Sequence, residues 1–214
     1  MKLVIIEDQI LMRELLVMAF QTSFRESVIH IAGTRCTGIA LCRQHQPDII
    51  LLRVALPDGD GLEIVPTIRA ISPDSKILVV SSHVDEYTLH RAFAVHVNGF
   101  VDKNVQGIDS LHEAIRGVLK GEFYASPSIQ EVRARMRSDT TSFVKVLSDR
   151  EMQLLRFCGY GKSNEEIGAL VGLKPCTVRN HRHNIMVKLD IKSTPQLVRY
   201  AIEKGFTRGQ IANG

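Results

Sequence analysis

The chain has 214 residues, enough for one large domain or two ordinary ones, and its formal net charge at neutral pH is +4. Charged residues make up 23% and hydrophobic residues 44%, a composition typical of folded globular proteins rather than of disordered ones. No apolar run approaches the roughly 18 residues that a membrane-spanning helix needs, so we expect no membrane contact.

The amino-terminal sequence and the cysteines indicate a cytoplasmic protein. The start, MKLVIIEDQ, has a short apolar run followed by acids, which argues against a secretory signal peptide. The cysteines form neither a CxxC pair nor a cluster with histidines at zinc-binding spacing. We therefore expect reduced thiols and no metal site.

Short β-rich runs alternate with helical patterns along the first half of the chain. The predicted strands are Lys2–Ile6, Val28–Ala32, Asp48–Leu52, Lys76–Val80 and Gly99–Asp102. Amphipathic stretches such as Ile10–Phe20 and Ser110–Gly121 lie between them. Nearly continuous apolar strands predict burial on both faces, and the intervening helices predict parallel crossovers. Residues 1–122 are therefore predicted to form an α/β domain, a doubly wound five-stranded parallel sheet with strand order 2-1-3-4-5.

The pattern lapses between residues 123 and 145. This stretch includes SPSIQEVRARMRSDTTS, which is polar and lacks a clear apolar face. We interpret it as a linker with at most one or two helical turns. Only helical segments follow, so residues 146–214 are predicted to be an all-α domain.

Helix boundaries are well marked in the second half. The sequences SDRE and SNEE, which begin at Ser148 and Ser163, both fit the S-x-x-E capping box. A third helix should begin near Pro175, since proline suits the first helical turn. With a tight turn around Gly172, the second and third helices predict a helix-turn-helix, and Gln196–Lys204 predicts a last helix.

The charge is unevenly distributed between the two halves. Residues 1–125 carry 12 Lys/Arg against 15 Asp/Glu, which gives −3, and residues 126–214 carry 15 against 8, which gives +7; the two sum to +4. An acidic half joined to a basic half predicts that the second half contacts a polyanion. A basic surface that serves only solubility is the alternative.

Polar side chains follow several predicted strands at the point where each strand ends. Glu7 and Asp8 follow the first strand, Arg53 the third, Ser81 ends the fourth, and Lys103 follows the fifth. The carboxyl ends of parallel strands meet at one edge of a sheet, and functional groups gather there. We therefore expect these side chains to converge.

This half resembles the receiver domain of response regulators. In that family, an acid pair after the first strand binds Mg²⁺, and an aspartate at the end of the third strand accepts a phosphoryl group. A Ser or Thr on the fourth strand contacts that group, and a lysine after the fifth pairs with it. The residues that match by position and type are Glu7, Asp8, Ser81 and Lys103, and Ser81 and Phe100 match the family's switch positions. The resemblance places Arg53 at the phosphoacceptor position.

Arg53 forbids the usual chemistry of that position. A guanidinium is permanently cationic, cannot form an acyl phosphate and repels Mg²⁺. Glu7 and Asp8 supply −2 and Arg53 and Lys103 supply +2, so the charges balance without a metal. We predict that Arg53 hydrogen-bonds Glu7 or Asp8, that Mg²⁺ binding is lost, and that the protein has no cofactor.

Other interpretations of this corner stay open. In one interpretation, Arg53 turns into solvent and the corner is the remnant of an ancestral site. In a second, Arg53 is an engineered substitution. Phosphorylation at Asp58 or Asp60 is a third interpretation, although both are ordinary turn residues. Ser81 and Phe100 are equally compatible with plain packing.

The second half resembles the LuxR-type helix-turn-helix domain of the NarL/FixJ group over nearly all of residues 147–205. The match runs through LSDREMQLL, GKSNEEIGALVGL, TVRNHRHNIMVKL and TPQLVRYAIEKG. The resemblance implies binding to double-stranded DNA as a homodimer that forms through the last helix. The dimer contacts named on that helix are Leu197, Val198 and Ala201.

The third helix of this domain has an apolar and a polar side. Val178, Ile185 and Leu189 recur at helical spacing and should face the core. A helix in the major groove offers polar side chains to base edges, and the candidates for base contacts are Arg179, Asn180 and His183. The candidates for phosphate contacts are Thr177, Arg182, Lys188 and Lys192. The alternative is a solvated basic helix face.

These features together predict a sequence-specific transcriptional regulator of the two-component type. Its atypical receiver would act without aspartyl phosphorylation and would need no partner kinase. Two alternatives stay open: a receiver-like interaction protein that modulates other regulators, and a regulator controlled by a ligand or partner at the receiver. We expect no enzymatic activity, because the sequence has no P-loop, no GxGxxG after a strand and no nucleophile–base signature.

Overall fold

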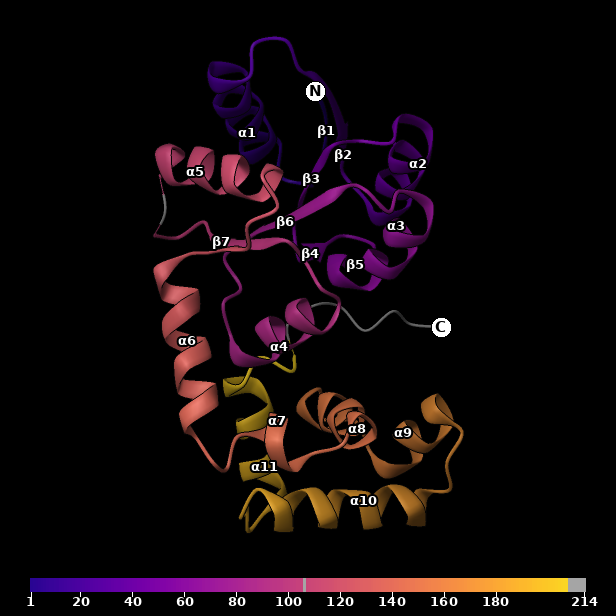
Figure 1. Ribbon diagram of the computed structural model, residues 1–214. Helices are drawn as coiled ribbons and strands as arrows, with labels where there is room; N and C mark the ends of the chain where they lie inside the picture. Colours follow the sequence, from indigo (N-terminus) through magenta and orange to yellow (C-terminus); the bar gives the residue numbers. More distant parts are fainter. Residues whose placement is uncertain (106, 208–214) are drawn as a thin grey trace. The chain divides into compact units, whose positions relative to one another are not determined.

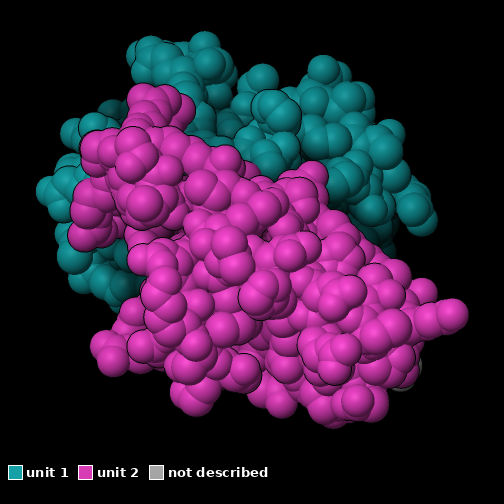
Figure 2. Space-filling view, turned by 90° about the horizontal axis from the view of Figure 1, so that it is seen from below, with its two compact units in different colours: residues 1–84, 91–131, 209–214 teal, residues 85–90, 132–208 magenta. Residues whose placement is uncertain are grey.

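The computed structural model describes residues 1–105 and 107–207, and the chain divides into two compact units (Figures 1 and 2). Among the described residues, unit 1 contains Met1–Val84 and Arg91–Glu131, and unit 2 contains Asp85–His90 and residues 132–207. The last residues of the predicted second domain, 208–214, lie outside the described part. No described helix is long and apolar enough to cross a bilayer.

Unit 1 is built on a six-stranded parallel sheet. The strands are β1 (Lys2–Ile6), β2 (Val28–Ala32), β3 (Ile49–Leu52), β6 (Lys76–Ser81), β7 (Gly99–Asp102) and β8 (Tyr124–Ala125). Their order is β2-β1-β3-β6-β7-β8, with parallel pairing throughout. The α/β fold, the five predicted strands and their order are confirmed.

The sixth strand corrects the prediction of five. β8 lies in the segment interpreted as a linker and pairs with β7, with Gly99 opposite Tyr124. Two residues are too few to show the alternation that marks a strand in a sequence. The linker segment also contains α6 (Pro127–Ser138) and α7 (Phe143–Val146), so it is more helical than predicted. The hydrophobic pattern of the sequence does not reveal α6, because the buried face of this helix is narrow and includes only a few apolar side chains, such as Ile129.

Helices cover both faces of the sheet, α1 and α5 on one face and α2 and α3 on the other (Figure 1). The helices of this part of the chain are α1 (Ile10–Ser23), α2 (Arg35–His45), α3 (Val65–Ile71), α4 (Glu86–Ala94) and α5 (Ile108–Leu119). Leu3 and Ile5 of β1 and Leu51 of β3 pack with Phe20 of α1 and Ile115 of α5, and all five are at most 1% exposed. These apolar contacts fix the sheet against its helices.

Unit 2 is helical and contains the predicted helix-turn-helix. Its longer helices are α8 (Asp149–Gly159), α9 (Asn164–Val171), α10 (Pro175–Lys188) and α11 (Thr194–Glu203). Both predicted capping boxes are present, at Ser148 and at Ser163. Gly172 ends α9 with a left-handed φ of 69°, a conformation that favours glycine, and α10 begins at Pro175. The turn between the two helices therefore lies where the sequence predicted it.

A stacked pair of histidine rings lies at the edge of the sheet in unit 1. His30 on β2 and His45 at the end of α2 have ring centroids 3.5 Å apart and ring planes 14° apart. Lys2 lies beside them, and its Nζ donates to the His45 carbonyl oxygen at 3.1 Å. Burial lowers the pKa of His30, and the charges of His45 and Lys2 lower it further. The neutral form of His30 is therefore favoured in the folded unit.

We expect unit 1 to lose stability as the pH falls below about 6.5, the ordinary histidine pKa. A histidine whose pKa is lower in the folded state stabilises the fold while it is neutral, and this contribution is lost once the unfolded chain takes up a proton. In calorimetric scans at about pH 7.5 and about pH 5.5, the Tm of unit 1 should drop more in the wild type than in His45→Gln. An equal drop in both proteins would contradict this assignment.

Candidate functional site

The carboxyl ends of three strands bring charged side chains together in unit 1. Glu7 and Asp8 follow β1, Arg53 follows β3, and Lys103 follows β7. The ends of β1 and β3 are joined by a backbone hydrogen bond, in which the Arg53 N–H donates to the Ile6 carbonyl oxygen at 3.0 Å. We call the four side chains of Glu7, Asp8, Arg53 and Lys103 the charged corner.

Arg53 turns toward the two acids. Its Nη1 donates to Glu7 Oε1 at 2.5 Å, and its Nε lies 3.1 Å from Asp8 Oδ1. The Nε hydrogen is donated to the Ala55 carbonyl oxygen at 2.7 Å, so the buried Asp8 Oδ1 is paired by charge without a hydrogen bond. The Arg53 side chain is only 15% exposed, which excludes the interpretation that it turns into solvent.

The two acids differ in their need for a counterion. The Glu7 side chain is 2% exposed and the Asp8 side chain 33% exposed. A carboxylate as buried as Glu7 is costly unless a cation and hydrogen bonds satisfy it. Glu7 receives the short contact from Arg53, a hydrogen bond at 3.1 Å from the Gln9 N–H, and a longer ion pair with Lys103. Arg53 is thus the main counterion of Glu7.

Lys103 has weaker contacts than Arg53. Its Nζ lies 3.8 Å from Glu7 Oε2 and donates to Gln9 Oε1 at 3.4 Å. Burial lowers the pKa of Lys103, the charge of Glu7 opposes this shift, and the charge of Arg53 adds to it. Gln9 was missed in the sequence, where it carries no signal beyond its position next to the acid pair.

The two residues that match the family's switch positions are packed inside unit 1. Ser81 ends β6 at the same edge of the sheet and is 1% exposed, and its Oγ accepts from the His83 N–H at 3.0 Å. Phe100 is fully buried. The Lys103 N–H donates to the Ser81 carbonyl oxygen at 3.1 Å, which fixes the end of β7 against β6.

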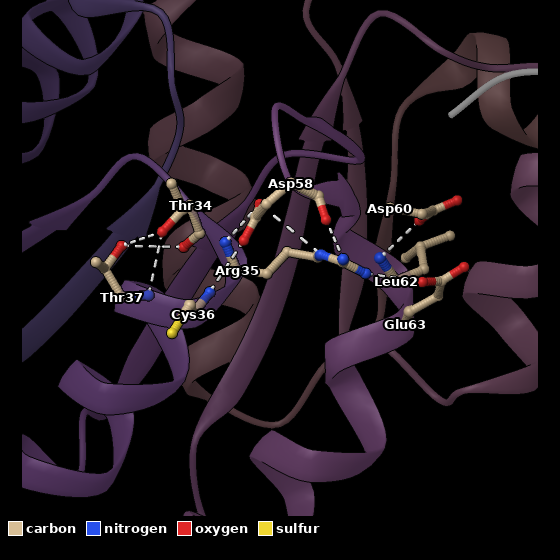
Figure 3. A network of polar contacts seen from close by, with 8 residues as sticks. All are labelled: Thr34, Arg35, Cys36, Thr37, Asp58, Asp60, Leu62 and Glu63. Carbon is tan, nitrogen blue, oxygen red and sulfur yellow. Dashed lines mark hydrogen bonds and ion pairs between the residues drawn. The ribbon is translucent and has the colours of Figure 1, made fainter. Parts of the chain in front are cut away.

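The loop after Arg53 folds into a short hairpin of β4 (Ala55–Leu56) and β5 (Gly59–Asp60), followed by a 3₁₀ turn. The Asp58 carboxylate accepts from the Arg35 N–H at 2.9 Å and from the Cys36 N–H at 3.2 Å, so it caps the start of α2 (Figure 3). The Asp60 carboxylate accepts from the Leu62 N–H at 2.8 Å.

Arginines neutralise the acids of this loop. The Arg35 guanidinium donates to Glu63 at 2.8 Å and to the Asp58 carbonyl oxygen (Figure 3). Arg91 forms an ion pair with Asp60, whose side chain is 1% exposed. The two aspartates considered as alternative phosphoacceptors, Asp58 and Asp60, therefore both have structural partners.

Two glycines are required for this arrangement. Gly59 has a φ of 128°, in the region that favours glycine, and a Cβ there would collide with the Arg35 guanidinium. A Cβ on Gly61 would collide with the carbonyl oxygen of Arg53. The loop can therefore pass close to the charged corner only with glycine at these positions.

In unit 2, α10 presents the candidates for base contacts together. Arg179, Asn180 and His183 are all exposed on this helix. Val178 and Ile185 on its other side are fully buried, which confirms the predicted core face. The third predicted core residue, Leu189, is partly buried against the same core.

The candidates for phosphate contacts lie in different environments. Arg182 is partly buried and bonded within its own unit: Nε donates to Cys158 Sγ at 3.1 Å, Nη1 to Asn164 Oδ1 at 3.2 Å, and Nη2 to the Lys162 carbonyl oxygen at 2.7 Å. No sequence signal indicates this network, because its partners come from α8, from the turn before α9 and from the first residue of α9. It gives Arg182 a structural role.

The other phosphate candidates are more accessible. Lys188 is 42% exposed and forms an ion pair at 2.7 Å with Glu151 of the α8 capping box. Lys192 is 78% exposed and pairs with Asp190, which is itself exposed. Thr177 is partly buried in the first turn of α10.

The residues that α11 exposes are not the ones predicted for dimer contacts. Leu197 and Ala201 are fully buried in the core of unit 2, because they pack beneath the helix, and Val198 is partly buried. Ile202 is 49% exposed and is the large apolar side chain that α11 presents to solvent. A dimer that forms through α11 would therefore use its exposed face, including Ile202.

Each half of the chain matches a known protein family. Residues 3–116 match the response regulator receiver domain, and residues 145–201 match the luxR family of bacterial regulatory proteins. The chain therefore belongs to the response regulators, as a two-component regulator with a LuxR-type DNA-binding domain.

Among its relatives is the oxygen regulatory protein NreC. The NreC of Staphylococcus carnosus (strain TM300) is 30% identical over 213 residues, which cover 95% of this chain and 98% of the relative. The NreC of Staphylococcus haemolyticus (strain JCSC1435) is 31% identical over 215 residues, with the same coverage.

Solved structures of RcsB share the fold. The structure of two RcsB dimers bound to two parallel DNAs has a TM-score of 0.65 at 17% identity, and it covers 95% of this chain and 98% of that chain. RcsB from Salmonella enterica serovar Typhimurium, bound to promoter P1flhDC in the presence of the phosphomimetic BeF₃⁻, has a TM-score of 0.62 at 18% identity, with the same coverage. The parallel α/β domain followed by a helical domain is thus a shared architecture.

We expect Arg53→Met to lower the free energy of unfolding of unit 1 by about 3 kcal/mol, because it leaves Glu7 buried with only a distant cation. Arg53→Met combined with Glu7→Gln should recover much of this loss, since the buried charge is then gone. Urea unfolding of the single and double variants measures both effects. Arg43→Met, a change on the exposed face of α2, is the matched control. Wild-type stability in Arg53→Met would contradict the role given to the ion pair.

Proposed function

We propose that this protein is a sequence-specific DNA-binding transcriptional regulator whose receiver acts without aspartyl phosphorylation. The observation that carries the proposal is the contact of Arg53 with both acids of the charged corner, Glu7 at 2.5 Å and Asp8 at 3.1 Å. Arg53 follows β3, where the resemblance to receivers places the phosphoacceptor. A guanidinium at this point offers no carboxylate oxygen to a phosphoryl group.

The charged corner does not fit the Mg²⁺ that receivers bind. Mg²⁺ requires several oxygen ligands in octahedral geometry. Glu7 and Asp8 already have Arg53 as a counterion, and Arg53 supplies no third carboxylate. Within the described ranges, no group of three or more His, Cys, Asp or Glu side chains is arranged to hold a metal ion. We infer that the protein works without a metal cofactor and without a partner kinase.

Double-stranded DNA is the partner that unit 2 fits best. The RcsB structures that share the fold include two dimers bound to DNA, and we extend DNA binding as a homodimer to this chain. Arg179, Asn180 and His183 would contact base edges from α10, and Thr177 and Lys192 would contact phosphates. Two of the phosphate candidates, Arg182 and Lys188, would first have to leave their present partners.

This role is regulatory rather than catalytic, and it places the protein in the cytoplasm, where the chromosome is. The exposed polar face of α10 supports gene regulation over an interaction protein, because Arg179, Asn180 and His183 are residue types that can hydrogen-bond to base edges. A signal other than phosphorylation then sets its activity.

We expect Arg53→Asp to restore Mg²⁺ binding and phosphorylation by acetyl phosphate, because the change restores the missing carboxylate beside Glu7 and Asp8. Calorimetric titration measures the first effect and intact-protein mass spectrometry the second. Arg53→Asn is the matched control, since it removes the guanidinium but supplies no carboxylate.

The wild-type protein should neither bind Mg²⁺ at this corner nor form an aspartyl phosphate. A stable aspartyl phosphate on the wild type would overturn the proposal. If Arg53→Asp ignores Mg²⁺ as well, the corner has lost more than its phosphoacceptor.

We expect two changes in unit 2 to weaken DNA binding in different ways. Arg179→Ala should cost about 1–3 kcal/mol at the preferred site and little on random DNA, because it removes a base contact. Lys192→Ala should weaken both kinds of DNA alike, because a phosphate contact carries no sequence information. Binding curves on the two DNAs check this. Equal losses on both DNAs in Arg179→Ala would remove Arg179 from the base readers.

A further inference from the structure

A cavity of about 230 Å³ lies between α1 and α5 in unit 1, the two helices that Figure 1 shows on one face of the sheet. Its walls are apolar and come from α1, from the ends of two strands and from α5, and they include Met12, Leu15, Leu16, Val80, Val101 and Leu111. At one end of the gap, His112 of α5 is hydrogen-bonded to the Ala19 carbonyl oxygen of α1 at 2.6 Å, so the two helices are held together there.

The cavity is larger than a packing defect. Protein interiors are close-packed, and an engineered apolar cavity of roughly 150 Å³ is enough to bind benzene. The space here is open to the outside, where Leu15 and Ile108 on its rim are 43% and 52% exposed. A Cβ added to Gly107, another lining residue, would meet no atom within 4 Å. A small molecule therefore has both room and access.

One lining residue is charged. Among the described residues around the cavity, Lys103 is the only ionisable one, and its side chain is 14% exposed. The Lys103 ammonium has only long contacts with Glu7 and Gln9, so an anion that enters from the apolar side gains from its charge, because apolar walls screen the attraction little. The chemistry of the walls thus specifies an apolar body with one negative group at the Lys103 end.

The charged corner leaves Lys103 available for this role. Arg53 holds Glu7 at 2.5 Å, while Lys103 stays 3.8 Å from the same carboxylate and forms a 3.4 Å hydrogen bond with Gln9. Neither contact of Lys103 is short, so an incoming carboxylate would replace weak partners rather than a tight ion pair. This step rests on the proposed function, because Arg53 takes over Glu7 only in a receiver that lacks a phosphoacceptor.

We propose that this cavity binds a small amphipathic carboxylate, with its negative group on Lys103 Nζ and its apolar body between α1 and α5. A water molecule occupies about 30 Å³ in the liquid, so the cavity volume corresponds to roughly eight water-sized groups. A six-carbon carboxylate such as hexanoate has this size. Such a ligand gives the receiver a chemical input in place of phosphorylation.

Calorimetric titration of the full chain with hexanoate, hexan-1-ol and acetate tests the proposal. Hexanoate should bind at least about tenfold more tightly than either hexan-1-ol, which lacks the charge, or acetate, which lacks the apolar body. Lys103→Met should reduce hexanoate binding by about tenfold or more and leave hexan-1-ol binding unchanged. Lys120→Met, an exposed lysine at the other end of α5, is the matched control and should leave both unchanged.

A second variant keeps the test valid if Lys103→Met fails to fold. Gly107 has a φ of −88°, which any residue adopts, so Gly107→Leu should fold and fill the cavity. It should abolish the binding of hexanoate and of hexan-1-ol alike. Circular dichroism and the Tm of each variant confirm that it is folded.

Three outcomes overturn the proposal: no binding of hexanoate, equal binding of hexanoate and hexan-1-ol, or binding that neither Lys103→Met nor Gly107→Leu weakens. Sedimentation velocity shows whether the chain forms a dimer. If a second copy of the chain covers the cavity and excludes hexanoate, the proposal also fails. The result is separate from that of the proposed function, because a wild type that binds hexanoate and still forms an aspartyl phosphate disproves only the latter.

Discussion

The ion pair between Arg53 and Glu7 is the constraint on which the arrangement of unit 1 depends. Glu7 is nearly inaccessible to solvent and sits where β1 gives way to α1, so it must have a cation close by. The same contact joins the ends of β1 and β3, and Glu7 also accepts the N–H of Gln9 just before α1. One side chain thus neutralises a buried charge, ties two strands and leaves Lys103 with only long contacts.

Unit 2 uses its charges in a comparable way. Arg182 and Lys188 could be expected on a DNA-facing surface, yet both hold their own domain together, Arg182 through the neighbouring helices and Lys188 through Glu151. Arg179, Asn180 and His183 remain exposed on α10. In both units, then, some of the basic side chains stabilise the fold and a smaller set is left for partners.

The sequence predicted the parts of this structure that depend on local pattern and missed those that depend on distant contacts. Apolar runs located five strands, and the capping serines located the starts of α8 and α9. β8 was missed because its two residues gain their structure from pairing with β7. Charge balance predicted the contact of Arg53 with the acids. The burial of Leu197 and the network around Arg182 were not predictable, because both are set by packing between helices that are far apart in the chain.

The ion pairs of unit 2 affect how steeply its affinity for DNA depends on ionic strength. Lys188, Lys192 and Arg199 each already face an acid of their own chain. A cation that is neutralised before it meets DNA displaces fewer counterions from the double helix when it arrives. The affinity of this domain should therefore weaken less steeply with added salt than a count of its lysines and arginines implies.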